Sequence, residues 1–359
     1  MPSLSLPKLR PGDKVATVSP SFAAPGKWPH VYELGLKRLR EVFQLEPVAL
    51  PATAKLGASA AERTSDLIAA FEDKTIKAVI ASLGGDDQVT YVKDLPPEPF
   101  IKNPKPFFGF SDNTHFENFL WLHGVPSYYG GSLFTQFAMQ DRMDPYTIEY
   151  LKHAFFDSGE FELKPSDTFN EIGLGWDDPA NLVKERVYEK NESWYWDGSD
   201  VSGGEGTTGG VAQTAVQGIT WGGCVESIDE LLRHGVAIPS LADFENVVLI
   251  AETSEEIPSP DYVFRVFRAL GESGILERIK AVIVGRPKAW EFNKQTTPDE
   301  RRAYREAMRE KILSVVRMYN KAAPVIQNFN IGHTDPQIAM PYGKNIKIDA
   351  SAKKVFAEF

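Results

Sequence analysis

The feature that most constrains the fold of this chain is the alternation of short apolar runs with amphipathic helical patterns in its first half. The runs end in small or polar turn residues, and the successive segments are KVATVSPS (14–21), VYELGLKRLREVF (31–43), AERTSDLIAAFED (61–73), KAVIASLGG (77–85) and PFFGFS (106–111). This alternation predicts an α/β domain with a mostly parallel sheet flanked by helices. Ligands bind at the carboxyl ends of such strands, so we expect the chemistry near SLGG and GFSDN.

The second half predicts a further domain of mixed strands and helices. Its segments are GITWGG (218–223), CVESIDELLRHG (224–235), ENVVLIAE (245–252), DYVFRVFRALGESG (261–274), KAVIVGRP (280–287) and a long charged helix over 297–319. Between the halves, residues 164–210 are rich in Gly, Asp, Glu and Trp and show little periodicity, which indicates a connection with a flexible glycine-rich loop. We expect an N-terminal domain over 1–163, a connecting segment over 164–210 and a C-terminal domain over 211–359.

Composition narrows the classes of partner. With 39 basic and 49 acidic side chains the formal charge is −10, which argues against general binding to a nucleic acid polymer or an anionic membrane. The single cysteine, Cys224, excludes an intrachain disulfide framework and a cysteine-based metal cluster. No run approaches the roughly 20 apolar residues of a membrane span, and the first residues lack the apolar core of a signal peptide. We expect a cytoplasmic protein.

Ser111 is the first candidate for chemistry. It follows the apolar strand PFFGF and precedes a predicted helix, so a tight strand-to-helix turn would project its hydroxyl into solvent. Backbone N–H groups and the positive helix end there can stabilise an oxyanion. The alternative is that Ser111 is only a helix N-cap, because serine is a favoured cap and the pattern is not the G-x-S-x-G elbow.

A nucleophilic serine needs a base, usually histidine, and a carboxylate that orients it. Among the six histidines, His115 is near Ser111 on the same helix, and His123 and His234 precede glycines at helix ends. His333 lies in the loop NIGHTDPQIAMPYG, where no periodic pattern requires it.

Four glutamates are candidates for the orienting carboxylate. Glu252 ends the buried run VVLIA, Glu255 and Glu256 follow it in a more polar segment typical of surface acids, and Glu226 lies on a predicted helix.

Two further turns have possible ligand contacts. Gly84 and Gly85 at a strand end allow close approach of the backbone to a ligand, or form a plain turn. In GRPKAW, Arg286 and Lys288 either hold a carboxylate or lie in a solvated loop. No cluster has metal-ligand spacing, and neither a phosphate-binding GxxxxGK[ST] loop nor a GxGxxG motif occurs, so we expect no metal and no cofactor.

These fragments together resemble the LD-carboxypeptidase family of serine peptidases, which includes the microcin C immunity proteins. The resemblance spans nearly the whole chain, in the order LRPGDKVATVSPS, SLGG, GFSDNT, WGGCVESI, VVLIAETSEE, AVIVGRP and NIGHTDPQIAMPYG. It implies a two-domain serine hydrolase, often a dimer, in which Ser111 is the nucleophile, Glu252 the orienting acid and His333 the base. The backbone N–H groups of Gly85 and Asp112 match the oxyanion hole of the family.

Two departures from the family pattern bear on the substrate. Asp86 and Asp87 follow the glycines, where they would repel an anionic group or attract a cationic one. The longer connection with SWYWDG resembles the immunity-type branch, so Trp194 or Trp196 either stacks on a nucleobase or packs the domain junction.

The resemblance implies cleavage of an amide bond through an acyl-enzyme. The expected substrate is either a small peptide, namely a murein tetrapeptide, or the amide of an aminoacyl nucleotide, and the expected partner is a second copy of the chain. A non-catalytic peptide- or nucleotide-binding protein on the same fold is the alternative.

Overall fold

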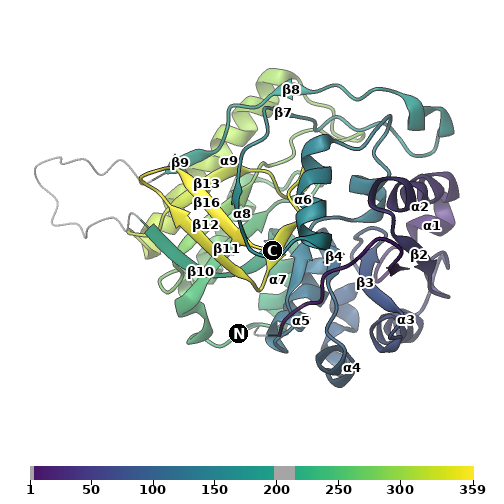
Figure 1. The fold of residues 1–359 in the computed structure, drawn as a ribbon. Coiled ribbons are helices and arrows are strands. Elements are labelled where there is room, and N and C mark those ends of the chain that lie inside the picture. Colours follow the sequence, from purple (N-terminus) through teal and green to yellow (C-terminus); the bar gives the residue numbers. More distant parts are fainter. Residues whose placement is uncertain (1–3, 198–214) are drawn as a thin grey trace, which may run out of the picture.

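The computed structural model describes residues 4–197 and 215–359, and two sheets organise it (Figure 1). The first sheet has six strands in the order β14-β5-β4-β3-β1-β2. In the order of the chain these are β1 (Lys14–Val18), β2 (Glu46–Ala49), β3 (Ile76–Ala81), β4 (Phe107–Gly109), β5 (Ser127–Tyr129) and β14 (Met340–Tyr342). All neighbours pair in parallel except β14, which is antiparallel to β5.

Helices accompany this sheet as the alternation predicts. They are α1 (Ala24–Lys27), α2 (Pro29–Phe43), α3 (Ala60–Glu72), α4 (Glu98–Lys102), α5 (Thr114–Leu122) and α6 (Pro145–Phe156). The central strands β3 and β4 are almost entirely buried, as expected for parallel strands covered on both faces.

The second sheet has eight strands in the order β6-β16-β15-β10-β11-β12-β13-β9. They are β6 (Glu160–Leu163), β9 (Tyr195–Asp197), β10 (Ala215–Cys224), β11 (Val247–Glu252), β12 (Ala281–Gly285), β13 (Val325–Phe329), β15 (Asn345–Asp349) and β16 (Lys354–Glu358). The four strands β10 to β13 are parallel and the flanking strands are antiparallel, which makes the sheet mixed. The predicted fold class is confirmed.

The larger sheet is accompanied by α7 (Val225–His234), α8 (Pro260–Glu272) and α9 (Pro298–Tyr319). Helix α9 begins with a capping box between Thr297 and Glu300, which satisfies two of its free N-terminal N–H groups. Within the described part of 164–210 lie a small ribbon of β7 (Thr168–Phe169) and β8 (Glu189–Lys190), and then β9. The glycine-rich loop expected at 198–210 lies outside the described residues.

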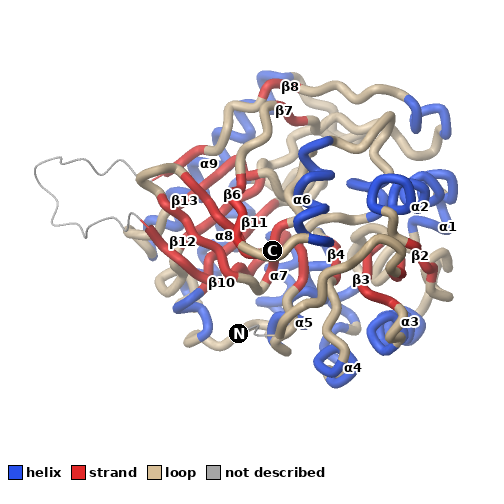
Figure 2. Tube along the Cα trace, viewed as in Figure 1, coloured by secondary structure: helices blue, strands red, loops and turns tan. Residues whose placement is uncertain are grey.

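The chain crosses between the two units more than once. Strand β6 belongs to the larger sheet although the chain before it builds the smaller one, and β14 returns to the smaller sheet from the second half. Figure 2 shows the two groups of strands close together, with α5, α6 and α7 near their junction. Because β14 follows the His333 loop directly, this exchange holds that loop against the unit that carries Ser111. The proposed boundaries at 163 and 210 stay predictions.

Candidate active site

Ser111 occupies a strained turn between β4 and α5. Its φ is 64°, in the left-handed region that a non-glycine residue rarely adopts, and its side chain is partly exposed. Such a conformation costs on the order of 1–3 kcal/mol and is typical of functional positions. Ser111 is the first residue of a 3₁₀ turn (Ser111–Asn113), and neither this turn nor α5 has a side-chain N-cap bond. The N-cap alternative is therefore not what the structure shows.

The SLGG turn lies directly against Ser111. A Cβ atom on Gly84 would lie 3.1 Å from Ser111 Oγ and 3.4 Å from the backbone nitrogen of Asp112, so any larger residue would crowd both. Gly85 has a φ of 148° and is exposed. The two turns are tied together by Gln88, whose backbone N–H donates to Asp112 Oδ2 at 3.2 Å. The two predicted oxyanion-hole residues, Gly85 and Asp112, therefore belong to neighbouring turns around Ser111.

Glu252 and His333 form a close pair. Glu252 is the last residue of β11 and is 1% exposed, and its Oε2 lies 2.7 Å from His333 Nδ1. Gly332 makes this approach possible, since a Cβ atom there would lie 2.5 Å from the same carboxylate oxygen. The His333 ring packs edge-on against Phe110, the neighbour of Ser111, with ring centroids 5.0 Å apart. The structure thus brings the three residues of the predicted triad to one place from β4, β11 and the loop after β13.

Tyr129 links the serine turn to Glu252 and was not anticipated from the sequence. Its hydroxyl donates to Glu252 Oε1 at 2.6 Å and accepts from the backbone N–H of Ser111 at 3.2 Å. The side chain is fully buried at the end of β5. Because β5 lies beside β4, the only sequence signal is that SYYGG also ends a strand at the same edge. This hydroxyl joins the two sheets across the site.

Glu255 contacts the second ring nitrogen of His333. Its Oε2 lies 3.0 Å from His333 Nε2, although the side chain is half exposed. Burial lowers the pKa of His333, but Glu252 and Glu255 outweigh it and raise that pKa to about 10. Burial by itself raises the pKa of Glu255, but the charge of His333 has the larger effect and lowers that pKa to about 2. Expecting Glu255 to be an ordinary surface acid was wrong, because the turn after β11 returns it to the imidazole.

The competing residues are engaged elsewhere. Glu226 is half-buried and accepts hydrogen bonds from Ser254 Oγ at 2.6 Å and Cys224 Sγ at 3.3 Å. His115 lies between Asp112 Oδ1 at 3.0 Å and Glu230 Oε2 at 3.2 Å.

The group Asp112, His115 and Glu230 is the one set of potential metal ligands among residues 4–197 and 215–359. Burial lowers the pKa of His115, but the two carboxylates outweigh it and raise that pKa to about 9. The His115 imidazole thus lies between two carboxylates, which favour its charged form.

The proposed substrate contacts are spread over the molecule. Trp194 is 6% exposed, stacks on Phe329 at 4.1 Å between ring centroids and donates to Asn330 Oδ1 at 2.9 Å, which places it in the core. Trp196 is half-buried on the edge strand β9. Arg286 is buried at the end of β12.

Asp87, after the glycine turn, pairs with Arg63 at 2.6 Å, which offsets the negative charge of Asp87.

A different aromatic cluster lies closer to the glycine turn. Trp28 packs against Phe22 and Trp176, with ring centroids 6.0 and 5.1 Å away. The backbone N–H of Phe22 donates to Gly84 O at 3.1 Å. Because Gly84 contacts Ser111, Phe22 connects the aromatic cluster to the serine turn. Trp28 and Trp176 are both partly exposed. Trp176 lies in the tryptophan-rich stretch 164–210, which the sequence predicts to be a connecting segment.

The arrangement has the parts that acyl transfer requires. A serine hydrolase site consists of a hydroxyl on a strained turn, a histidine paired to a buried carboxylate, and backbone N–H groups at a glycine turn.

No helix among the described residues is long and apolar enough to cross a membrane.

Comparison with known proteins places the chain in a family. Residues 15–130 match the LD-carboxypeptidase N-terminal domain and residues 217–348 the LD-carboxypeptidase C-terminal domain. The chain is 26% identical over 347 residues to "Putative carboxypeptidase YocD" of Bacillus subtilis (strain 168), covering 96% of this chain and 95% of that protein. It is 22% identical over 297 residues to the microcin C7 self-immunity protein MccF of Escherichia coli, covering 82% and 77%.

Solved structures show the same fold. An MccF-like protein from Streptococcus pneumoniae in complex with AMP superimposes with a TM-score of 0.80 at 26% identity, covering 96% of this chain and 98% of that one. MccF in complex with aspartyl sulfamoyl adenosine gives a TM-score of 0.82 at 19% identity, covering 99% of both chains. The resemblance inferred from the sequence is confirmed: the chain belongs to the LD-carboxypeptidase family, which also includes the microcin immunity protein MccF.

Proposed function

We propose that this protein is a serine amidase that cleaves its substrate through an acyl-enzyme on Ser111. The observation that carries the proposal is the contact of 2.7 Å between Glu252 and His333, held beside the strained Ser111 turn. Glu252 orients the imidazole and stabilises its charged form, which is the role of the acid in a serine triad. Tyr129 positions this acid relative to the serine backbone.

The first half of the reaction forms an ester. Neutral His333 takes the Ser111 proton on Nε2 while Oγ bonds to the substrate carbonyl carbon. The N–H groups of Gly85 and Asp112 stabilise the negative oxygen, and one such donor is worth about 10²–10³ in kcat in an unrelated serine protease. His333 then gives its proton to the leaving nitrogen as the carbon–nitrogen bond breaks.

The second half releases the acid product. A water molecule gives a proton to His333 Nε2, its oxygen bonds to the acyl carbon, and the ester bond to Ser111 breaks. The serine oxygen recovers the proton from His333. The base works only when Nε2 is free, so Glu255 must leave this nitrogen during the cycle.

The amide of an aminoacyl nucleotide is the substrate class that we favour. Complexes of related proteins with AMP and with aspartyl sulfamoyl adenosine support a nucleotide moiety. On this chain, Trp28 and Trp176 offer partly exposed rings near the glycine turn, and stacking on a base is worth about 1–3 kcal/mol.

A murein tetrapeptide is the second candidate, supported by the carboxypeptidase name of the relative that covers nearly all of this chain.

That the protein is a homodimer stays a prediction, and light scattering tests it.

The test is mass spectrometry after incubation with an aminoacyl sulfamoyl adenosine and, separately, with a murein tetrapeptide. We expect cleavage of the adenosine compound by the wild type and a loss of orders of magnitude in Ser111→Ala. Ser314→Ala, which removes an exposed hydroxyl on α9, is the matched control and keeps full activity.

Cleavage of the tetrapeptide alone would replace the favoured substrate class. Unchanged hydrolysis in Ser111→Ala would overturn the serine mechanism. Binding with no hydrolysis by the wild type would favour a non-catalytic role.

A further inference from the structure

We propose a second ligand site: an arginine-lined pocket in the larger unit that binds a phosphate group. The pocket is a cavity of about 430 Å³ between α9, the ends of β12 and β13, and the segment around β8 and β9. None of Ser111, Glu252 and His333 lines it. The inference therefore goes beyond the proposed hydrolase reaction and does not depend on it.

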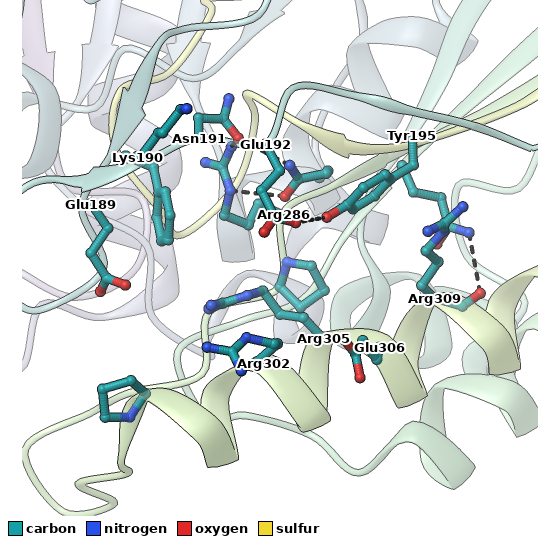
Figure 3. A pocket seen from close by; sticks show the side chains of 16 residues that line it. Glu189, Lys190, Asn191, Glu192, Tyr195, Arg286, Arg302, Arg305, Glu306 and Arg309 are labelled. Carbon is teal, nitrogen blue, oxygen red and sulfur yellow. Dashed lines mark hydrogen bonds between the residues drawn. The ribbon is translucent and has the colours of Figure 1, made fainter.

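The lining of the pocket contains more arginine and lysine than glutamate. Four arginines and one lysine face three glutamates, which leaves a surplus of two positive charges: Lys190, Arg286, Arg302, Arg305 and Arg309 against Glu189, Glu192 and Glu306. Figure 3 shows Arg286 on one wall of the pocket and Arg302 and Arg305 on the helix α9 that forms the opposite wall. A concave site with this balance attracts anions.

Arg286 is the central observation. It is 1% exposed, and its guanidinium donates to Asn328 at 2.9 Å, Asn191 at 2.8 Å and Thr334 at 3.3 Å, all of them neutral acceptors. Within the described parts of the chain, no carboxylate lies within salt-bridge distance of it. A buried charge without a counter-ion costs several kcal/mol, so natural proteins rarely keep one without a reason.

Unlike Arg286, the other arginines of the pocket have carboxylate partners, because Arg302 pairs with Asp299 at 3.1 Å and Arg309 with Asp197 at 2.5 Å. Glu171 is fully buried and is shared between Arg305 Nη1 at 2.8 Å and Arg301 Nε at 2.7 Å. The guanidinium groups of Arg286 and Arg305 both lie over the Phe169 ring, 4.5 and 5.3 Å from its centroid. Burial and the repulsion from Arg305 lower the pKa of Arg286 to about 10, so it is still charged at neutral pH. An anion between these groups would relieve the repulsion.

The geometry favours phosphate over a planar carboxylate. Guanidinium groups on two opposite walls can donate to different oxygens of a tetrahedral anion. A planar carboxylate needs only the two parallel N–H groups of one guanidinium. The volume is within the usual range for a small-molecule pocket. The phosphate can belong to a nucleotide or to an independent small molecule, and the pocket recognises the same group in both.

The test is calorimetric titration of the full chain with inorganic phosphate and, separately, with AMP. We expect phosphate to bind, and Arg302→Gln to weaken it by about tenfold or more, since the variant removes one charged donor. Arg302 is 63% exposed, so this variant should keep the wild-type melting temperature. Arg142→Gln, at a side chain that is 71% exposed in the smaller unit, is the matched control and should bind like wild type.

The outcomes separate the sources of the phosphate. Equal weakening of AMP and phosphate by Arg302→Gln assigns the pocket to the nucleotide, and weakening of phosphate alone assigns it to an independent ligand. Absence of phosphate binding, or wild-type affinity in a folded Arg302→Gln variant, would overturn the proposal. Ser111→Ala should bind phosphate normally, so failure of the hydrolase mechanism leaves this test intact.

Discussion

Glu255 Oε2 lies 3.0 Å from His333 Nε2, the nitrogen that must accept the serine proton in the proposed reaction. The imidazole is thus held between two carboxylates, because Glu252 binds its other nitrogen at 2.7 Å. Together they raise the pKa of His333 to about 10 despite its burial. In this state the base is protonated at neutral pH, and activity requires Glu255 to move away.

Replacing Glu255 tests this relationship through the pH profile. In Glu255→Gln the negative charge near Nε2 is lost, so the pKa of His333 falls and the acid limb of kcat/KM moves to lower pH. Each unit of that fall gives about tenfold more neutral histidine below the pKa. We expect higher kcat/KM at pH 7, measured across pH 5–10. Glu256→Gln, at the exposed neighbouring residue, is the control and should have the acid limb of kcat/KM at the same pH as the wild type. If the acid limb of Glu255→Gln also lies at the wild-type pH, Glu255 does not restrain the base.

Tyr129→Phe tests whether the bridging hydroxyl positions Glu252. The variant leaves a buried carboxylate oxygen without its donor at 2.6 Å, a loss of about 1.5–3 kcal/mol for a bond to a charged group. We expect kcat to fall by about tenfold or more with little change in KM. Tyr128→Phe, which removes a neighbouring buried hydroxyl bonded to Lys8, should keep kcat. Equal kcat in the two variants would assign Tyr129 a purely structural role.

Gly332→Ala tests the steric fit behind the histidine. The new methyl group would lie 2.5 Å from Glu252 Oε2, at a backbone φ of 92°. We expect kcat to fall by orders of magnitude because the carboxylate is pushed from the imidazole. Gly12→Ala has nearly the same φ, 89°, with open space around the new methyl, so it reports the backbone strain alone, on the order of 1–3 kcal/mol. Urea unfolding and steady-state kinetics on both variants separate the two effects, and similar kcat values would contradict the prediction.

Trp176→Ala tests the aromatic cluster as a nucleobase platform. Loss of stacking worth about 1–3 kcal/mol should raise KM for an aminoacyl sulfamoyl adenosine by about tenfold. KM for a murein tetrapeptide, which has no base, serves as the internal control and should not change. An equal change for both substrates would indicate that Trp176 only supports the local fold through Trp28 and Phe134.

The sequence by itself determined the fold class and the places where chemistry was expected. Hydrophobic periodicity is a local property, so the strands that end at Gly109 and Glu252 were evident from the order of apolar and polar residues. Strand ends also limited the candidates for the site, because parallel strands present their carboxyl ends at one edge.

Only the tertiary structure decided which groups touch at the site. Glu255 and His333 are 78 positions apart, and Tyr129 and Glu252 are 123 apart, so no local pattern indicates that they meet. The pairing of β14 with β5 holds the His333 loop against the Ser111 unit, and this long-range contact makes one site from two sheets. Arg286 reads locally as a loop cation, and only the packing of Phe169, Asn191 and Asn328 around it buries its charge. Burial and partner charges set the behaviour of each ionisable group, and these depend on how distant segments pack together.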